Sequence, residues 1–460
     1  MDHYTTAATV APPTVPLSFV QEDAEWSRFC HQLPAHTEAQ ARTTGAFQRR
    51  RGVPSPFALL RLVFVYAWTD WSLRLVATWA ALQGVAEVSD VALLNRLRGA
   101  RAWLSRLVGM LLLGAQLGTA APVARLRLVD ATSISAPGSA GTDWRVHLSF
   151  DLAALRLDAI ELTDVHGAEG LPRFPPAPGD LFITDSGYAR ANELGLLCAQ
   201  GGQFITRTGW SKLCFQEAPG TRWELLPWLQ ALPPDPVTEC ALHLATTSGA
   251  YPVRLIAVRL PPAAVERARR RLKRQASKKG DTTREGTRVA AAFCLIVTNL
   301  PAEQWTNAQV LALYRVRWHV ELAIKRLKGV WQLDELRAHD PDLAQACLLG
   351  KLLGALLAQD LTMEIQAACP DWFGSVARPV SLWRLQQLEF ACLRQVVIGS
   401  LSWGAVRTRL ATIQRFLRDA PRKKRPQLLA WAQAWLQEGG LLEPGADRLA
   451  SPPREVAQMA

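Results

Sequence analysis

The hydrophobic pattern of the chain changes near Pro122, and this change limits the fold more than any other feature. Before it, from Phe57 to about Leu117, apolar residues recur every three or four positions, which predicts helices. After it come short apolar runs that predict strands, over 125–131, 144–152, 154–163, 180–184 and 203–206, with a helix over 188–200. Strands followed by a helix and a further strand indicate a mixed α/β layer.

The same pattern of expected helices and strands divides the 460 residues into five regions. They are an N-terminal helical region over 1–118 that we expect to bind DNA, an α/β core in two parts over 119–210 and 293–365, an insertion rich in strands over 211–292, and a C-terminal helical region over 366–460. The second part of the core contains a long helix from Thr306 to about Trp331. We expect the C-terminal region to serve in dimerisation.

Charge and cysteine usage exclude several classes of protein. Lys and Arg total 52 against 40 Asp and Glu, a net charge of +12, which favours a polyanionic partner and above all nucleic acid. The eight cysteines are scattered, without a CxxC pair, and are expected to be reduced thiols of a cytoplasmic protein. Residues 1–20 lack the pattern of a signal peptide, and the apolar stretches are too short or too interrupted to span a bilayer, so we expect no membrane association.

Three groups of basic residues are candidates for contact with nucleic acid. Helical patterns over 71–83 and 91–98, with Ser89 and Asp90 as an N-cap, resemble helix-turn-helix geometry, although an ordinary helical hairpin is an equal interpretation. The second helix carries Arg96 and Arg98. A basic run over 267–279, which includes Arg270, Arg271 and Lys273, is either a phosphate contact or a solvated face. A third cluster lies between 415 and 425.

The most informative helix is predicted over 314–328. One of its faces carries a single carboxylate among three cations and a phenol, namely Tyr314, Arg317, Glu321, Lys325 and Lys328. A second stripe, offset by one residue, is apolar and is expected to be buried: Leu313, Val316, Val320, Ile324 and Leu327. The pattern therefore predicts a packed helix that presents Glu321 within a cationic surface.

Two further acids follow predicted strands. Asp130 comes after the run 127–129, and Asp185 comes after the run 181–184. Acids at strand ends point into the crevice where ligands of α/β sheets bind, although either one alone could simply begin a turn or cap a helix. Together with Glu321 they predict a site for two Mg²⁺ ions, with Mn²⁺ as a substitute. One ion would activate a water or a 3′-hydroxyl and the other would stabilise the leaving 3′-oxygen in phosphoryl transfer.

These residues resemble the motifs of bacterial insertion-sequence transposases of the DDE class, the IS-four group. Tyr314, Arg317, Glu321 and Lys328 match its Y-R-E-K signature in every position, and the runs 128–132 and 185–188 resemble its first two catalytic blocks. The resemblance implies an RNase H-like catalytic core interrupted by a β-rich insertion and flanked by helical regions. It implies that Asp130, Asp185 and Glu321 bind the metals, and that Tyr314, Arg317 and Lys328 hold phosphates.

The activity implied is cut-and-paste DNA transposition, by metal-dependent hydrolysis and strand transfer at terminal inverted repeats. The expected partners are double-stranded DNA, both transposon ends and target, and a second copy of the chain, because two ends must be held together. We expect a cytoplasmic, nucleoid-associated protein of bacteria. In parts of the group a tryptophan of the insertion stacks on a flipped base; Trp210, Trp223 and Trp228 are candidates, but core packing is the favoured interpretation of each.

Two alternatives remain: an RNase H-like nuclease that cuts without joining, and a catalytically inactive DNA-binding protein derived from a transposase. The second is disfavoured because all three acids are present. Other enzyme classes lack their motifs, since the chain has no GxxxxGK[ST] loop, no HExxH pair and no GxSxG elbow.

Overall fold

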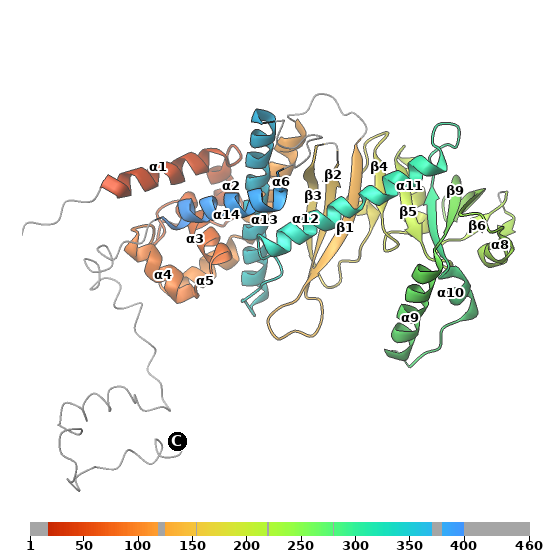
Figure 1. Cartoon of the computed structure of the whole chain (residues 1–460). Coiled ribbons are helices and arrows are strands. Elements are labelled where there is room, and N and C mark those ends of the chain that lie inside the picture. Colours follow the sequence, from red (N-terminus) through yellow and green to blue (C-terminus); the bar gives the residue numbers. More distant parts are fainter. Residues whose placement is uncertain are drawn as a thin grey trace, which may run out of the picture.

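A long twisted sheet joins a bundle of helices at one end of the molecule to a smaller mixed unit at the other (Figure 1). The computed structural model describes residues 17–117, 125–152, 154–218, 220–278, 280–369 and 380–399. The basic cluster expected between 415 and 425 and most of the expected C-terminal region lie outside the described residues. The prediction of a mixed α/β fold is confirmed.

The sheet has ten strands in the order β3-β2-β1-β4-β5-β10-β9-β8-β6-β7. Strand β1 pairs in parallel with β4, and β4 with β5, whereas every other neighbouring pair is antiparallel. The strands are β1 Leu126–Ile134, β2 Trp144–Asp151, β3 Arg156–Asp164, β4 Leu181–Thr184, β5 Gln203–Thr208, β6 Phe215–Gln216, β7 Arg222–Trp223, β8 Val237–Thr246, β9 Gly249–Arg259 and β10 Phe293–Thr298.

Both faces of the sheet are buried, so the central strands read as continuous apolar runs rather than alternating ones. Leu128 and Ile183 enter one hydrophobic core, and their neighbours Val129 and Phe182 enter the other. The first face is covered by α6 (Arg101–Leu117), α11 (Asn307–Val316), α12 (Trp318–Gly329) and α13 (Pro341–Ala368). The second is covered by η1 (Leu171–Arg173), α7 (Ala191–Ala199), α8 (Leu225–Ala231) and α10 (Glu285–Ala290). The result is a three-layer arrangement.

The helical bundle combines elements from both ends of the described chain. Its N-terminal members are α1 (Leu17–His31), α2 (Thr37–Thr43), α3 (Pro56–Trp68), α4 (Leu73–Leu82) and α5 (Asp90–Gly99). They pack with α13 and with α14 (Leu382–Ile398), because α13 contacts α3, α5 and α6 while α14 contacts α1 and α3. Two helices joined by a turn were predicted before residue 99 and are confirmed as α4 and α5, with the Ser89 hydroxyl accepting from the Ala92 amide at 3.2 Å.

The segment expected as a β-rich insertion adds strands to the same sheet. Strands β8 and β9 continue the ladder from β10, and β6 and β7 complete that edge. The segment also holds three helices, α8, α10 and α9 (Pro262–Lys278). Helix α9 has no buried residue and projects away from the sheet (Figure 1). The helix is amphipathic: its apolar residues Ala264, Val265, Ala268, Leu272 and Ala276 are half-buried along one stripe, and its basic residues are exposed.

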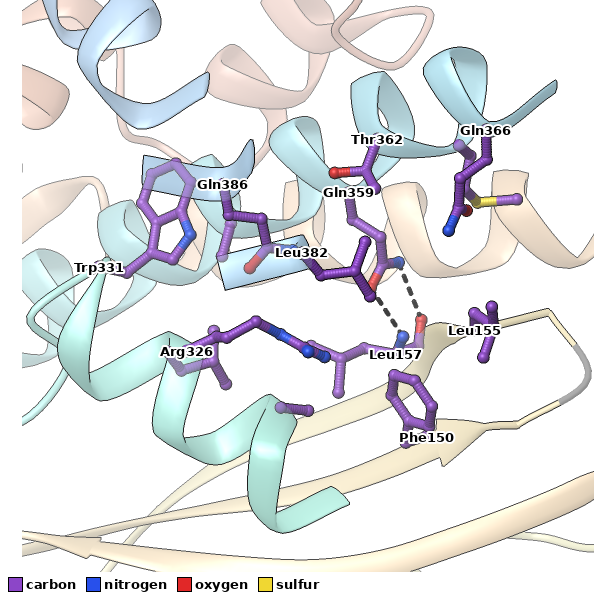
Figure 2. A pocket seen from close by; sticks show the side chains of 14 residues that line it. Phe150, Leu155, Leu157, Arg326, Trp331, Gln359, Thr362, Gln366, Leu382 and Gln386 are labelled. Atoms are coloured by element: carbon purple, nitrogen blue, oxygen red, sulfur yellow. Dashed lines mark hydrogen bonds between the residues drawn. The ribbon is translucent and has the colours of Figure 1, made fainter. Parts of the chain in front are cut away.

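Helix α13 ties the bundle to the sheet. Its Gln359 side chain accepts from the Leu157 amide of β3 at 2.7 Å and donates to the same residue's carbonyl at 3.4 Å (Figure 2). Beside this contact lies the half-buried Arg326 of α12, whose pKa is lowered by burial. Among the described residues α13 is the one helix long and apolar enough to cross a membrane, but 78% of its apolar window is buried inside the molecule.

Close packing of α13 depends on glycine. A Cβ atom at Gly354 would lie 2.4 Å from Cζ2 of Trp68 and 2.6 Å from Cζ3 of Trp331. We predict that Gly354→Ala lowers the free energy of unfolding by about 1–3 kcal/mol, because two buried indole rings must move. Gly109→Ala on α6 is the matched control, since a Cβ there meets nothing within 4 Å, and it should gain up to about 1 kcal/mol of helix propensity. Urea denaturation of both variants measures the difference, and equal stabilities would contradict the packing argument.

Candidate active site

Asp130 and Asp185 lie side by side on neighbouring chain segments. In the parallel pair β1 and β4, Val129 lies opposite Thr184 in the last matched position, and the two aspartates are the next residues of their strands. The prediction that Asp185 directly follows a strand is confirmed. The prediction that Asp130 ends its strand is wrong, because β2 continues the ladder on the other side of β1 and pairs Leu148 with Asp130.

The turn after β4 is held in place by short polar contacts. The Gly187 amide donates to Oδ1 of Asp185 at 2.6 Å. The Thr206 hydroxyl on β5 lies 3.2 Å from the Asp185 carbonyl oxygen and 2.8 Å from the Thr184 hydroxyl. The Lys212 ammonium donates to the carbonyl of Ser186. These contacts fix the backbone that carries Asp185 to the neighbouring strand.

The long helix predicted from Thr306 is divided in two. It begins with a capping box, in which the Thr306 hydroxyl accepts from the Gln309 amide and the Gln309 side chain accepts from the Thr306 amide. A turn at Arg317 separates α11 from α12, but Arg317 keeps a helical backbone (φ −49°, ψ −28°). The two helices therefore run on along nearly one line across the sheet (Figure 1).

The apolar stripe predicted for this segment packs against the core. Val320 and Leu327 are buried, together with Ala323, which the stripe did not include. Leu313, Val316 and Ile324 are half-buried against the same cluster. The neighbouring face, with Glu321, borders β1, which α12 contacts.

Arg317 joins two of the three predicted acids. Its Nη1 lies 3.5 Å from Oδ2 of Asp130, and its Nη2 pairs with Oε1 of Glu321. Burial is the main influence on the nearby Tyr314 hydroxyl and raises its pKa. Lys325 is exposed, with Nζ 4.2 Å from the Trp318 ring centroid. Lys328 donates to the Ser133 carbonyl at 3.4 Å, at the end of β1.

A fourth acid, which the sequence did not single out, lies beside Asp130 and Asp185 at the same ends of the strands. Glu169 belongs to the loop after β3, and a Cβ atom placed on Gly187 would lie 2.3 Å from its Oε2 and 2.9 Å from Oδ1 of Asp185. Burial, with the charges of Asp185 and Glu169, raises the pKa of Asp130 to about 6, against the opposing effects of a backbone amide and Arg317. The local sequence around Glu169 is that of an ordinary turn and does not indicate a functional residue.

The atoms of the site bear on whether a divalent cation fits it. Among the described residues, no three acidic, histidine or cysteine side chains converge on one point as they stand. Two observations favour a cation nevertheless. The Tyr188 hydroxyl is fully buried beside the acids without a hydrogen-bond partner among the described residues. Gly187 has no side chain to keep two carboxylates apart, since a Cβ there would lie only 2.3 Å from Oε2 of Glu169 and 2.9 Å from Oδ1 of Asp185. Hard oxygen ligands of this kind suit Mg²⁺.

The remaining predicted contacts lie apart from these acids. Arg98 binds Asp340 through two nitrogens, at 2.9 and 2.5 Å, and Arg96 donates to the carbonyl oxygens of Arg49 and Arg51. Both guanidinium groups are thus engaged within the chain. On α9, Arg271 and Lys273 are exposed, as is Arg270, which pairs with Glu266.

The three tryptophans of the inserted segment pack against the second hydrophobic core, as the core-packing interpretation predicted. Trp210 donates to the Thr287 hydroxyl at 3.2 Å, and the ring centroids of Trp223 and Trp228 are 5.4 Å apart. Trp210 and Trp223 also line a groove of about 680 Å³.

Comparison with known proteins gives consistent relatives. Residues 121–357 match the family described as "Transposase DDE domain". The chain is 38% identical over 346 residues to the transposase for insertion sequence element IS421 of Escherichia coli, covering 73% of this chain and 93% of that one. It is also 38% identical over 345 residues to the InsL transposase of element IS186A of E. coli K12, again covering 73% of this chain and 93% of that one. The transposase for IS231F of Bacillus thuringiensis subsp. israelensis is 22% identical over 275 residues, 53% of this chain and 57% of that one.

The raised pKa of Asp130 predicts a pH-dependent stability. The pKa of its carboxyl is about 6 in the folded chain against an ordinary value of 3.8, so the folded chain binds this proton more tightly. The free-energy cost of burying the charged carboxylate is therefore absent at low pH and complete above pH 6. Stability of the metal-free protein should therefore fall as pH rises through this window. We predict that Asp130→Asn stabilises it by about 1–3 kcal/mol near pH 8 and hardly at all near pH 4. Thermal melts in EDTA, with exposed Asp235→Asn as control, measure this; a gain independent of pH would contradict it.

Proposed function

The chain belongs to the insertion-sequence transposases with a DDE domain, and from that premise we propose that it cuts and joins DNA at the terminal inverted repeats of its element. Enzymatic activity of this class depends on divalent metal ions and acts on DNA. The observation that carries the proposal is the meeting of Asp130 and Asp185 at adjacent strand positions, with Glu321 brought beside Asp130 by Arg317.

We assign the metal-binding role to Asp130, Asp185 and Glu321. When bound, two Mg²⁺ ions would activate the attacking water or 3′-hydroxyl and stabilise the leaving 3′-oxygen. The residues of the chain supply the rest. Arg317 already balances two carboxylates, and its bidentate guanidinium is suited to a phosphate that enters between them. Tyr314 lies one turn earlier, and Lys328 of α12 reaches the end of β1. These two residues would hold the bound DNA strand on either side of Arg317.

The strands that carry these residues support an RNase H-like core. In this proposal β1 to β5 form its sheet, β10 with α11 and α12 completes it, and 211–292 is the insertion. Continuity of the ladder from β10 into β9 and β8 means that the insertion would be held rigidly to the core. The regions 1–118, 119–210, 293–365 and 366–460 remain our division of the chain.

Two surfaces are proposed to hold DNA beyond the acids. Lys325 is exposed on α12 beside the acidic residues. Helix α9 carries exposed cations, including Arg270, Arg271 and Lys273, and only Glu266 opposes them on that helix. Since the guanidinium groups of Arg96 and Arg98 have partners in the chain, the DNA proposal rests on α9 and α12 rather than on α5. A homodimer on DNA, in the bacterial cytoplasm and its nucleoid, completes the proposal.

Removing an acid tests the catalytic assignment. We predict that Asp185→Asn and Glu321→Gln each reduce cleavage roughly a thousandfold or more, since bound metal supplies several kcal/mol of transition-state stabilisation. Binding of a duplex with the terminal repeat should persist. A labelled duplex and a supercoiled target, with Mg²⁺ or EDTA, separate cutting from joining. Cleavage at the wild-type rate by either variant would remove that acid from the site, and cutting without joined product would favour the nuclease alternative.

Neutralising α9 tests the second DNA surface. We predict that Arg271→Gln combined with Lys273→Gln weakens DNA binding several-fold and reduces the slope of log affinity against log salt by about one to two, because each phosphate contact releases counterions. The control is Arg384→Gln with Arg394→Gln, which removes the same charge from exposed positions on α14. Equal salt slopes in the two double variants would leave α9 a solvated helix.

A further inference from the structure

Glu169 stands out because its carboxylate is close to the catalytic acids and has no partner. Among the described residues it makes no hydrogen bond or ion pair, whereas Asp185 accepts from the Gly187 amide and Glu321 is held by Arg317. Its Oε2 and Oδ1 of Asp185 both lie within 3 Å of the point where a Gly187 side chain would begin, so the two carboxylates crowd the same position beside that glycine. Two half-buried carboxylates so placed repel each other unless a cation lies between them.

A second, independent observation points into the same space. The Tyr188 side chain is fully buried, yet its hydroxyl has no hydrogen-bond partner among the described residues. Leaving such a group unsatisfied costs about 1–3 kcal/mol, so a partner is expected to enter. Burial and the charges of three acids, Glu169, Asp130 and Asp185, raise the pKa of this phenol against the opposing charge of Arg173, so the hydroxyl lies within reach of the acids' charges. A hydrated cation would bring water to it, since Mg²⁺ keeps several waters when it binds protein.

We propose that Glu169 is a fourth metal-binding residue of this transposase, and that with Asp185 and Asp130 it holds a first divalent cation before DNA binds. Glu321 is not required for this cation, because its carboxylate makes the closer of the two Arg317 contacts and is not the acid beside Glu169. The Tyr188 hydroxyl hydrogen-bonds to a water that accompanies the ion. The inference rests on the proposed function only in taking this cation to be one that cleavage uses.

The charge balance of the chain supports this assignment. The protein carries a net charge of +12, yet this part of the molecule gathers four carboxylates, those of Asp130, Glu169, Asp185 and Glu321, and Arg317 pairs with two of them, Asp130 and Glu321. Arg173, whose charge also acts on the Tyr188 phenol, is paired with Glu161 at 2.5 Å. A concentrated negative charge in a basic protein is costly unless it binds cations, which is the expected use of such a cluster.

Direct metal binding tests the inference without any DNA. We would titrate the full-length protein with Mn²⁺ and follow free Mn²⁺ by electron paramagnetic resonance. Glu169→Gln should weaken the tightest Mn²⁺ site by at least roughly tenfold, as should Asp185→Asn. Glu321→Gln should leave it unchanged, and the exposed Glu303→Gln controls for loss of one charge. Wild-type affinity in Glu169→Gln, equal loss in Glu321→Gln, or no Mn²⁺ binding by the wild-type chain would each overturn the proposal.

Tyr188→Phe separates a ligand-related role from a structural one. Because the hydroxyl has no partner in the described metal-free chain, its removal should leave the melting temperature in EDTA unchanged or higher, while the rise in melting temperature on adding Mn²⁺ becomes smaller. A lower melting temperature in EDTA with an unchanged Mn²⁺ shift would contradict us.

The two proposals can fail separately. If Mn²⁺ binding behaves as expected but DNA is neither cut nor joined, the metal site stands and the proposed function fails. If DNA is cut and Glu169→Gln binds Mn²⁺ normally, only this inference fails.

Discussion

The paired contacts of Arg317 with Asp130 and Glu321 organise the site, because these acids come from elements that are distant in sequence. The guanidinium is half-buried between β1 and the start of α12. Its positive charge balances the negative charges of the two carboxylates there. It also sets the position of α12 relative to β1. The turn between α11 and α12 falls at this same residue, so the backbone irregularity and the charge contact are one feature. The surrounding apolar packing of Val320 and Leu327 then holds the helix to the sheet.

Much of this arrangement could be predicted from the sequence because it is local. The strand after Pro122, the cap at Ser89 and the apolar stripe of α11 and α12 all follow from short-range patterns. The break at Arg317 could not, since it involves neither glycine nor proline and keeps helical angles. The continuation of β1 past Asp130 depends on β2, a partner that periodicity does not identify.

The missed side chains have a common cause: their partners are far away in the sequence. Arg98 carries the signature of a basic recognition helix, but its carboxylate partner Asp340 follows 242 residues later. Glu169 lies in a loop and becomes significant only because β1 and β4 bring Asp130 and Asp185 to the same edge. The acids of the motif were found because their spacing resembles a family pattern, whereas Glu169 has no place in that pattern.

The contacts of α3 and α4 with the end of α14 have a consequence for how the protein is made. The Arg61 side chain of α3 donates to the carbonyl of Val397, and Trp79 of α4 donates to that of Ile398, at 2.8 and 2.9 Å. The N-terminal helices therefore leave the ribosome long before the segment that closes their core has been synthesised. Until that segment is made, the apolar surface of α3 and α4 that faces it stays uncovered, so the bundle closes only after residue 398 has been synthesised.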